Sequence, residues 1–297
     1  MVTDTYTPTR PVTGTAAGIP FLALPPAAGG GPAPLVLALH AFEPPRSEAA
    51  LAGAVPMAPL PAWRIYLGLP LFGARLPEGG VAEVNRRGER DYLVELFGPV
   101  VEEASSELHR VTAELRSMFP VTDGPVGIVG VGAGASAVLL TLAEGHLPVG
   151  AAAAVNPIVD PALVVSARER LTGASYTWTD QAARTRGRLD FTARAEELAR
   201  ERTPLLVVSG GRDDVVPPEH GAALCAALAD ASAPTGQDGA HALRHIVVPD
   251  LAHVIGPEPG LEPGPLTPAG VLTDRALTEW FHRHLTASAQ VSGDPLD

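Results

Sequence analysis

The chain has 297 residues, of which 46% are hydrophobic, and its formal net charge is −12 at neutral pH. That length and composition predict a substantial core in one large domain or two small ones. The acidic balance argues against nucleic acid and anionic membranes as partners. The single cysteine, Cys225, excludes an internal disulfide and a cysteine-based zinc site.

The sequence carries no signal for export or membrane insertion. No apolar run reaches the ~20 residues of a membrane span. The first residues lack the basic start and apolar centre of a signal peptide. We therefore expect a cytoplasmic protein.

The two ends of the chain are polar, small and unpatterned, and we predict disordered tails over residues 1–15 and 287–297 around a domain at 16–286. Between them, short apolar runs alternate with helical patterns, which is typical of a mostly parallel sheet with crossover helices. The predicted strands are Pro20–Leu24, Leu35–Leu39, Arg64–Leu67, Val126–Val129, Gly150–Val155, Leu205–Ser209 and Arg244–Val248. The predicted helices are Asp91–Phe119, Ala133–Glu144, Phe191–Arg200, Glu219–Ala229 and Asp274–Ala287.

A polar, arginine-rich segment begins at residue 160, between two of the predicted core strands. Such an insertion favours a small cap over residues 160–200. A plain connector with one or two helices is the alternative.

A glycine-dense turn follows the strand that begins at Val126. The sequence Gly130-Val131-Gly132-Ala133-Gly134 has the frame G-x-S-x-G, in which a serine occupies a sharp strand-to-helix turn above a parallel sheet. Glycine stands at the serine position. The only nearby hydroxyl, Ser136, lies one turn into the following helix and is the alternative nucleophile if the register is shifted.

The same glycines also fit G-x-G-x-x-A, the dinucleotide-binding fingerprint, through Gly130 and Gly132. That motif needs an acidic residue at the end of the next strand, about 20 residues on. This chain has Asn156 there. Dinucleotide binding remains an alternative, but we expect no cofactor.

Three other segments place chemistry-bearing residues where predicted strands end. The strand Leu35–Leu39 is followed by His40, Ala41 and Phe42. The strand from Leu205 leads into Gly210-Gly211-Arg212-Asp213-Asp214-Val215-Val216-Pro217, and Val247-Val248-Pro249-Asp250 precedes His253.

This order of nucleophile turn, acid and histidine resembles the α/β-hydrolase superfamily of serine esterases and peptidases, whose triad runs that way along the chain. The resemblance implies an α/β-hydrolase fold, with Asp213 as the acid and His253 as the histidine. Asp214 is the rival acid, and we favour Asp213 for its spacing to Pro217.

The resemblance also implies an oxyanion hole made by the backbone N–H groups of Phe42 and Ala133. His40 is usually a structural hydrogen-bonding residue at such a strand end, with a catalytic role as the alternative. Glu43, beside Phe42, is either an additional acid or base or a solvated turn residue.

Glycine at position 132 removes the oxygen that would attack a carbonyl, so no acyl-enzyme can form there. We therefore expect an enzyme in which a His253–Asp213 dyad acts as general base on a water or on a small-molecule substrate, as a non-standard hydrolase, lyase or isomerase. The alternative is a pseudo-hydrolase that only binds a ligand or a partner. A third interpretation, an introduced replacement of serine, is disfavoured because alanine is the usual choice.

No metal site is predicted. His241, His245 and His253 are spaced four and eight residues apart, but they straddle a predicted strand and lack a matching carboxylate.

Overall fold

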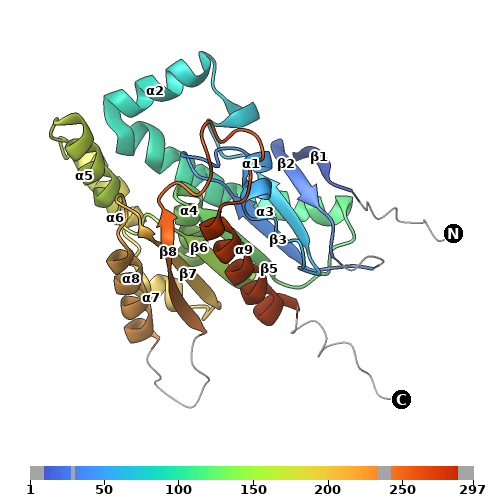
Figure 1. Ribbon diagram of the computed structural model, residues 1–297. Coiled ribbons are helices and arrows are strands. Elements are labelled where there is room, and N and C mark those ends of the chain that lie inside the picture. Colours follow the sequence, from blue (N-terminus) through green and yellow to red (C-terminus); the bar gives the residue numbers. More distant parts are fainter. Residues whose placement is uncertain (1–9, 28–30, 233–241, 287–297) are drawn as a thin grey trace.

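The computed structural model describes residues 10–27, 31–232 and 242–286. Within these residues one eight-stranded sheet runs through the molecule in the order β1-β2-β4-β3-β5-β6-β7-β8 (Figure 1). The strands are β1 (Val12–Ala16), β2 (Ile19–Leu24), β3 (Leu35–Leu39), β4 (Trp63–Leu67), β5 (Val126–Val131), β6 (Val149–Val155), β7 (Leu205–Arg212) and β8 (Leu243–Ala252). β2 pairs antiparallel with both β1 and β4, and all the other neighbours in the sheet pair in parallel. The mostly parallel sheet predicted from the sequence is confirmed.

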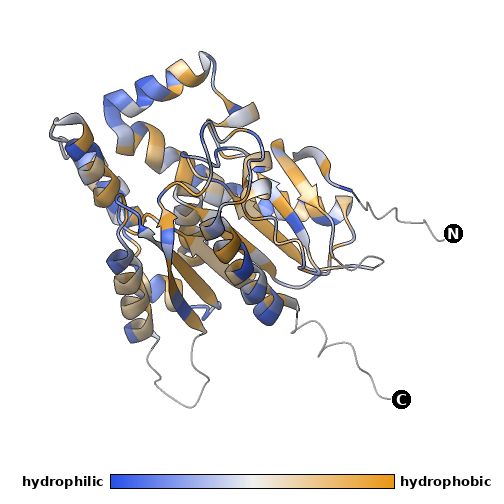
Figure 2. Ribbon diagram, viewed as in Figure 1, coloured by the Kyte–Doolittle hydropathy of each residue, from blue (hydrophilic) through white to orange (hydrophobic). Residues whose placement is uncertain are grey.

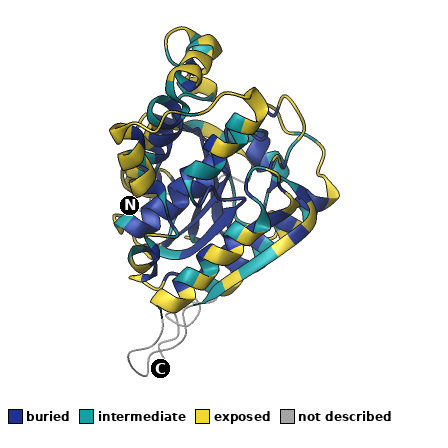
Figure 3. Cartoon of the chain, turned by 90° about the vertical axis from the view of Figure 1, so that its left-hand side faces the viewer, coloured by how far each residue is buried: buried dark blue, intermediate teal, exposed yellow. Residues whose placement is uncertain are grey.

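Helices cover both faces of the sheet. They are α1 (Glu48–Ala54), α2 (Gly80–Asp91), α3 (Gly98–Met118), α4 (Ala133–Glu144), α5 (Pro161–Thr172), α6 (Asp180–Leu189), α7 (Ala195–Ala199), α8 (Pro218–Ala231) and α9 (Pro268–Phe281), with the short helices η1 (Gly73–Arg75), η2 (Tyr92–Phe97) and η3 (His282–Thr286). Apolar residues of α3, α4, α7 and α8 form one core against the sheet, and α1 and α9 form the other. The central strands are hydrophobic along most of their length (Figure 2) and buried (Figure 3), as expected of parallel strands covered on both faces.

The first strand lies inside the predicted N-terminal tail, so the expected boundary at residue 15 is wrong. β1 pairs with β2 through a two-residue turn at Ala17 and Gly18, both at positive φ. Such a turn matches the twist of the strands it joins. The sequence of β1, VTGTA, lacks the apolar run that marked the other strands. Residues 1–9 and 287–297 lie outside the described residues.

The predicted helix Asp91–Phe119 is two elements, although the backbone stays helical through Phe97 and Gly98, where they join. Proline has no N–H and fits only the first turn of a helix. α3 accordingly begins at Gly98, with the wider helix η2 before it.

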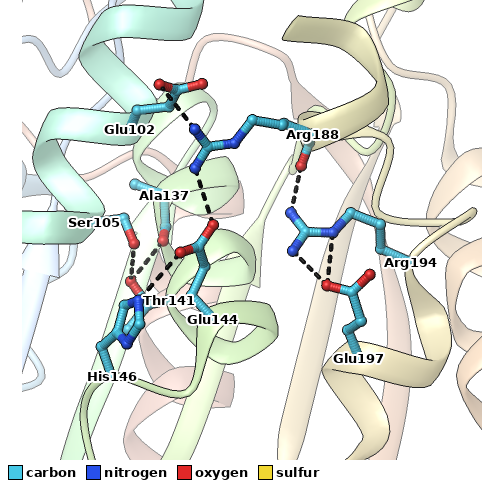
Figure 4. A network of polar contacts seen from close by, with 9 residues as sticks. All are labelled: Glu102, Ser105, Ala137, Thr141, Glu144, His146, Arg188, Arg194 and Glu197. Carbon is cyan, nitrogen blue, oxygen red and sulfur yellow. Dashed lines mark hydrogen bonds and ion pairs between the residues drawn. The ribbon is translucent and has the colours of Figure 1, made fainter. Parts of the chain in front are cut away.

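The segment between β6 and β7, which was expected as a cap or a connector, divides into three helices that lie in two places. α6 and α7 are fixed along the flank of the molecule, where Arg188 contacts Glu144 of α4 at 3.0 Å and Glu102 of α3 at 3.5 Å (Figure 4). In the same network Arg194 joins the carbonyl of Arg188 to Glu197. α5 lies instead at the end of the sheet where the parallel strands terminate.

Candidate active site

The acid and the histidine are brought together at the ends of β7 and β8. Nδ1 of His253 lies 2.8 Å from Oδ2 of Asp213, and both residues are buried. The other carboxylate oxygen of Asp213 accepts hydrogen bonds from the N–H groups of Val215 and Val216 at 2.9 and 2.7 Å. The backbone of this turn therefore holds the carboxylate in the orientation in which it contacts the imidazole.

Glycines at the end of β7 allow β8 to come this close. A Cβ on Gly210 would lie 2.4 Å from the carbonyl oxygen of Leu251, and one on Gly211 would lie 2.7 Å from that of Pro249. The register of the two strands shifts at this point. Gly210 and Gly211 are thus required for the close approach of the two backbones, which brings His253 next to Asp213.

Glu43 stands on the other side of the imidazole. Its Oε2 lies 3.9 Å from Nε2 of His253, and 41% of its side chain is exposed. The turn that carries Glu43 is joined to the loop after His253, because the N–H groups of Ile255 and Gly256 donate to the carbonyl of Pro44 at 3.2 and 3.3 Å. The two ring nitrogens of His253 therefore face two carboxylates.

These charges set the protonation of the histidine. Burial lowers the pKa of His253, but the hydrogen bond and charge of Asp213, with smaller contributions from Glu43 and Asp214, outweigh it and raise the pKa above its usual value. The surroundings of His253 therefore favour the imidazolium form more than water does.

Gly132 occupies the turn between β5 and α4 with φ 54° and ψ −118°. Positive φ at this position favours glycine. A Cβ built there would lie 3.1 Å from Cβ of Ala41, so it would meet the loop after β3 but no backbone carbonyl.

The two expected backbone donors lie on either side of this turn. Ala133 is the first residue of α4, so its N–H has no acceptor within the helix. Phe42 directly follows Ala41 in the loop that faces Gly132. Its ring stacks on Phe72 at 4.7 Å and meets the edge of Phe97 at 6.1 Å.

The same arrangement can be compared with known proteins. Residues 101–260, more than half of the chain, match the prolyl oligopeptidase family. The chain belongs to the prolyl oligopeptidase family. This is a family of α/β-hydrolase fold, so the predicted fold and superfamily are confirmed. No relative is found among curated protein sequences.

Solved structures similar to this family member include two chains of about its own length and one much longer peptidase. TT1662 from Thermus thermophilus is 22% identical with a TM-score of 0.65, over 93% of this chain and 98% of its own. The acylaminoacyl peptidase of Pyrococcus horikoshii is 16% identical with a TM-score of 0.61, over 93% of this chain and 41% of its own. Est1E from Butyrivibrio proteoclasticus, solved with ferulic acid, is 14% identical with a TM-score of 0.58, over 93% of this chain and 99% of its own. At these identities the likeness shows the fold.

The sequence analysis considered Asn156 only because a dinucleotide-binding motif would have an acidic residue there, and it missed the role of this residue in the site of this family member. Asn156, at the end of β6, is buried and has φ 46°. Its Oδ1 accepts from the N–H of Gly210 at 2.7 Å, and its Nδ2 donates to the carbonyls of Ala252 and His253 at 2.7 and 3.2 Å. Asn156 therefore joins the ends of β6, β7 and β8 beneath the dyad. An asparagine at a strand end, where a left-handed residue is tolerated, was the available signal.

The structure places the remaining candidates away from the chemistry. His40 is fully buried, donates from Nδ1 to the carbonyl of Ala41 and accepts from the N–H of Leu69 at Nε2, which is the structural role. Ser136 is also fully buried, and its hydroxyl donates to the carbonyl of Ile158 at 3.0 Å, so the shifted register is wrong. Asp214 is exposed, and it is Asp213 that contacts His253.

The glycines of the turn are explained by packing. A Cβ on Gly130 would lie 2.2 Å from the carbonyl oxygen of Gly134, and one on Gly134 would lie 2.4 Å from that of His40. Small residues thus let α4 approach β5 and the end of β3, which removes the sequence argument for a dinucleotide site at Gly130 and Gly132.

The histidines weighed as metal ligands do not form a cluster in the described part of the chain. His241 lies outside the described residues, and Nε2 of His245 contacts the hydroxyl of Ser209 at 3.0 Å. No group of three potential ligands is found among the described residues. Within the same residues, no helix has both the length and the apolar character to span a bilayer.

Proposed function

We propose that this chain is an enzyme of the hydrolase fold that acts on a small molecule without a serine nucleophile. The observation that carries the proposal is the combination of a closed Asp213–His253 pair with Glu43 at the free nitrogen of His253 and a glycine at the turn above β5. A binding protein would need none of these contacts. The same site in a serine hydrolase would carry a hydroxyl at position 132.

The hydrolytic reaction uses His253 as general base. Nε2 takes a proton from a water molecule, while the water oxygen forms a bond to the substrate carbonyl carbon. The N–H groups of Phe42 and Ala133 stabilise the resulting oxyanion. When the carbonyl re-forms, the bond to the leaving group breaks and the imidazolium returns its proton to that group. No covalent enzyme intermediate forms.

A second candidate, a lyase or isomerase reaction, is favoured by the raised pKa of His253 and the proximity of Glu43. In that reaction the carboxylate of Glu43 removes a proton from a substrate carbon and the imidazolium of His253 donates one to a neighbouring oxygen or leaving group. The two groups are 3.9 Å apart, so one substrate can contact both.

Turnover of p-nitrophenyl acetate and of the corresponding anilide tests the first reaction. We expect the wild type to turn over without a burst, and His253→Ala to lower kcat/KM by about 10²-fold or more. His146→Ala is the matched control, because His146 is exposed at the end of α4. Equal rates for the wild type and His253→Ala would contradict the proposal.

The pH dependence of kcat separates the two candidates. A general base must be deprotonated, so a hydrolytic rate rises as pH passes upwards through the pKa of His253. A general acid must be protonated, so a rate that depends on imidazolium falls over the same interval.

A further inference from the structure

A cleft of about 490 Å³ opens between the end of α2, η2 and α5. These elements stand on the side of the sheet where the parallel strands end (Figure 1). The lining is aromatic and polar, with Tyr92 and Tyr176 on facing segments and Val165 and Thr172 along α5. Its size suits a small organic molecule.

One cation in this cleft has no carboxylate partner among the described residues. Arg168 extends its guanidinium over the ring of Tyr92, 4.5 Å from the ring centre, and makes a 3.3 Å hydrogen bond to the carbonyl of Gly88. Arg90, which lines the same cleft, is instead paired with Glu95 and lies 3.9 Å from Glu83.

Two of the three carboxylates that line the cleft are occupied by donors of the protein, and the third, Glu89, is exposed. Asp91 accepts from the hydroxyl of Tyr176 at 2.7 Å and from the N–H groups of Leu93 and Val94. Glu169 accepts from the N–H of Tyr176 at 2.7 Å. Arg168 therefore keeps donors that can still be used by a ligand.

One hydrogen bond and one shared electrostatic influence link the elements around the cleft to the candidate active site. Arg170, also on α5, donates to the carbonyl of Asp214 at 3.1 Å, which fixes the helix to the loop that carries the acid. Tyr92 lies within the electrostatic reach of both Arg168 and Glu43: burial raises its pKa, the charge of Glu43 raises it further and that of Arg168 lowers it. The charges of Arg168 and of the carboxylate that faces His253 thus both act on Tyr92.

We infer that Arg168, with Tyr92 beside it, binds the carboxylate of the substrate, so that the natural substrate is a small organic acid whose reacting group reaches Glu43 and His253. A guanidinium presents paired donors that match a carboxylate. In a site that otherwise holds Glu43, Asp213 and Asp214, a substrate anion is accommodated only next to a cation. This inference names the substrate class for the proposed function and rests on it for the chemistry, but carboxylate binding can be measured without turnover.

Calorimetric titration with 3-phenylpropionate and its neutral amide, 3-phenylpropionamide, tests the inference. We expect the wild type to bind the acid at least tenfold more tightly than the amide, and Arg168→Gln to abolish that preference. Arg168→Lys, which keeps the positive charge but loses the paired donors of the guanidinium, should keep part of the preference for the acid. Arg90→Gln is the matched control, because it removes the same charge from the same cleft at a residue that is already paired.

The outcomes separate this inference from the proposed function. A wild type that binds neither probe at tens of millimolar, or binds both equally, would overturn the inference. So would an Arg168→Gln variant of unchanged melting temperature that keeps the preference, or an Arg90→Gln variant that loses as much. His253→Ala should bind the acid as the wild type does, so a failure of turnover without loss of binding refutes only the dyad.

Discussion

Nδ1 of His253 lies 2.8 Å from Oδ2 of Asp213, while Nε2 of the same ring lies 3.9 Å from Oε2 of Glu43. A serine hydrolase uses the first contact to orient an imidazole towards a hydroxyl. In this chain the second nitrogen faces the carboxylate of Glu43, and a glycine occupies position 132. We propose that the site keeps the proton-transfer groups of a serine hydrolase and lacks its nucleophile.

Removal of the acid should lower the pKa of His253. The folded state raises this pKa above 6.5, so the contact stabilises the protein fully below that pH, and the contribution is lost as pH rises through the folded value. In Asp213→Asn the charge is gone and burial dominates, so we expect the pKa measured by NMR to fall below that of the wild type. A value that does not change would show that Asp213 does not control the imidazole.

His40 should make the protein sensitive to acid. Burial lowers the pKa of His40 from 6.5 to about 4. The charge of Arg75 adds to this effect, and the hydrogen bond to the carbonyl of Ala41 opposes it. The unfolded state binds the proton more tightly, so stability is complete above pH 6.5 and decreases as pH falls towards 4, by up to about 3 kcal/mol.

The measurement for His40 is urea unfolding as a function of pH. His40→Gln removes the titration, and its stability should fall less between pH 6.5 and 4 than that of the wild type. Parallel pH dependences of the two proteins would contradict the assignment.

Asn156→Ala should lower the free energy of unfolding by about 2–4 kcal/mol, because it leaves the N–H of Gly210 and the carbonyl of Ala252 without their partner in a buried place. Alanine also tolerates the positive φ less well than asparagine. Asn85→Ala, on the exposed face of α2, is the matched control and should change stability by less than about 0.5 kcal/mol. Equal effects of the two substitutions in denaturant unfolding would argue against the role of Asn156.

Two glycines in helices should respond in opposite directions to alanine. At Gly134 the new Cβ would lie 2.4 Å from the carbonyl oxygen of His40, so we expect a loss of about 3 kcal/mol or more. At Gly187, in α6, the new Cβ meets nothing within 4 Å, so Gly187→Ala should stabilise the protein by about 0.5–1 kcal/mol. A tolerated Gly134→Ala would mean that α4 does not pack against the end of β3 as described.

Much of the sheet could be predicted because its strands are continuous apolar runs. Leu35–Leu39 and Ala133–Glu144 were predicted with their observed bounds, and each end of the other predicted strands lies within four residues of the observed end. β1 was missed because an edge strand with one buried residue has little apolar signal. α1 and α2 were missed for a related reason: α1 is short, and α2 is largely polar and exposed.

The candidate site was accessible from sequence only where the residues follow strands. Asp213 and His253 could be paired because the carboxyl ends of parallel strands share one edge of the sheet. The roles of Asn156 and Arg168 could not be predicted in this way. The contacts of Asn156 depend on its left-handed backbone conformation at the end of β6, and those of Arg168 depend on the position of α5. No spacing in the sequence encodes either.

Labelling with a fluorophosphonate tests most directly whether Gly132 stands at the nucleophile position served by His253. Gly132→Ser should fold, with a free energy of unfolding lowered by about 1–3 kcal/mol. The backbone at residue 132 has a positive φ, and the new Cβ would lie 3.1 Å from Cβ of Ala41. Mass spectrometry should find the label on the introduced serine of this variant, no label on the wild type, and none on the double variant that also carries His253→Ala. A folded Gly132→Ser variant that is not labelled, or a wild type that is labelled elsewhere in the site, would contradict the account.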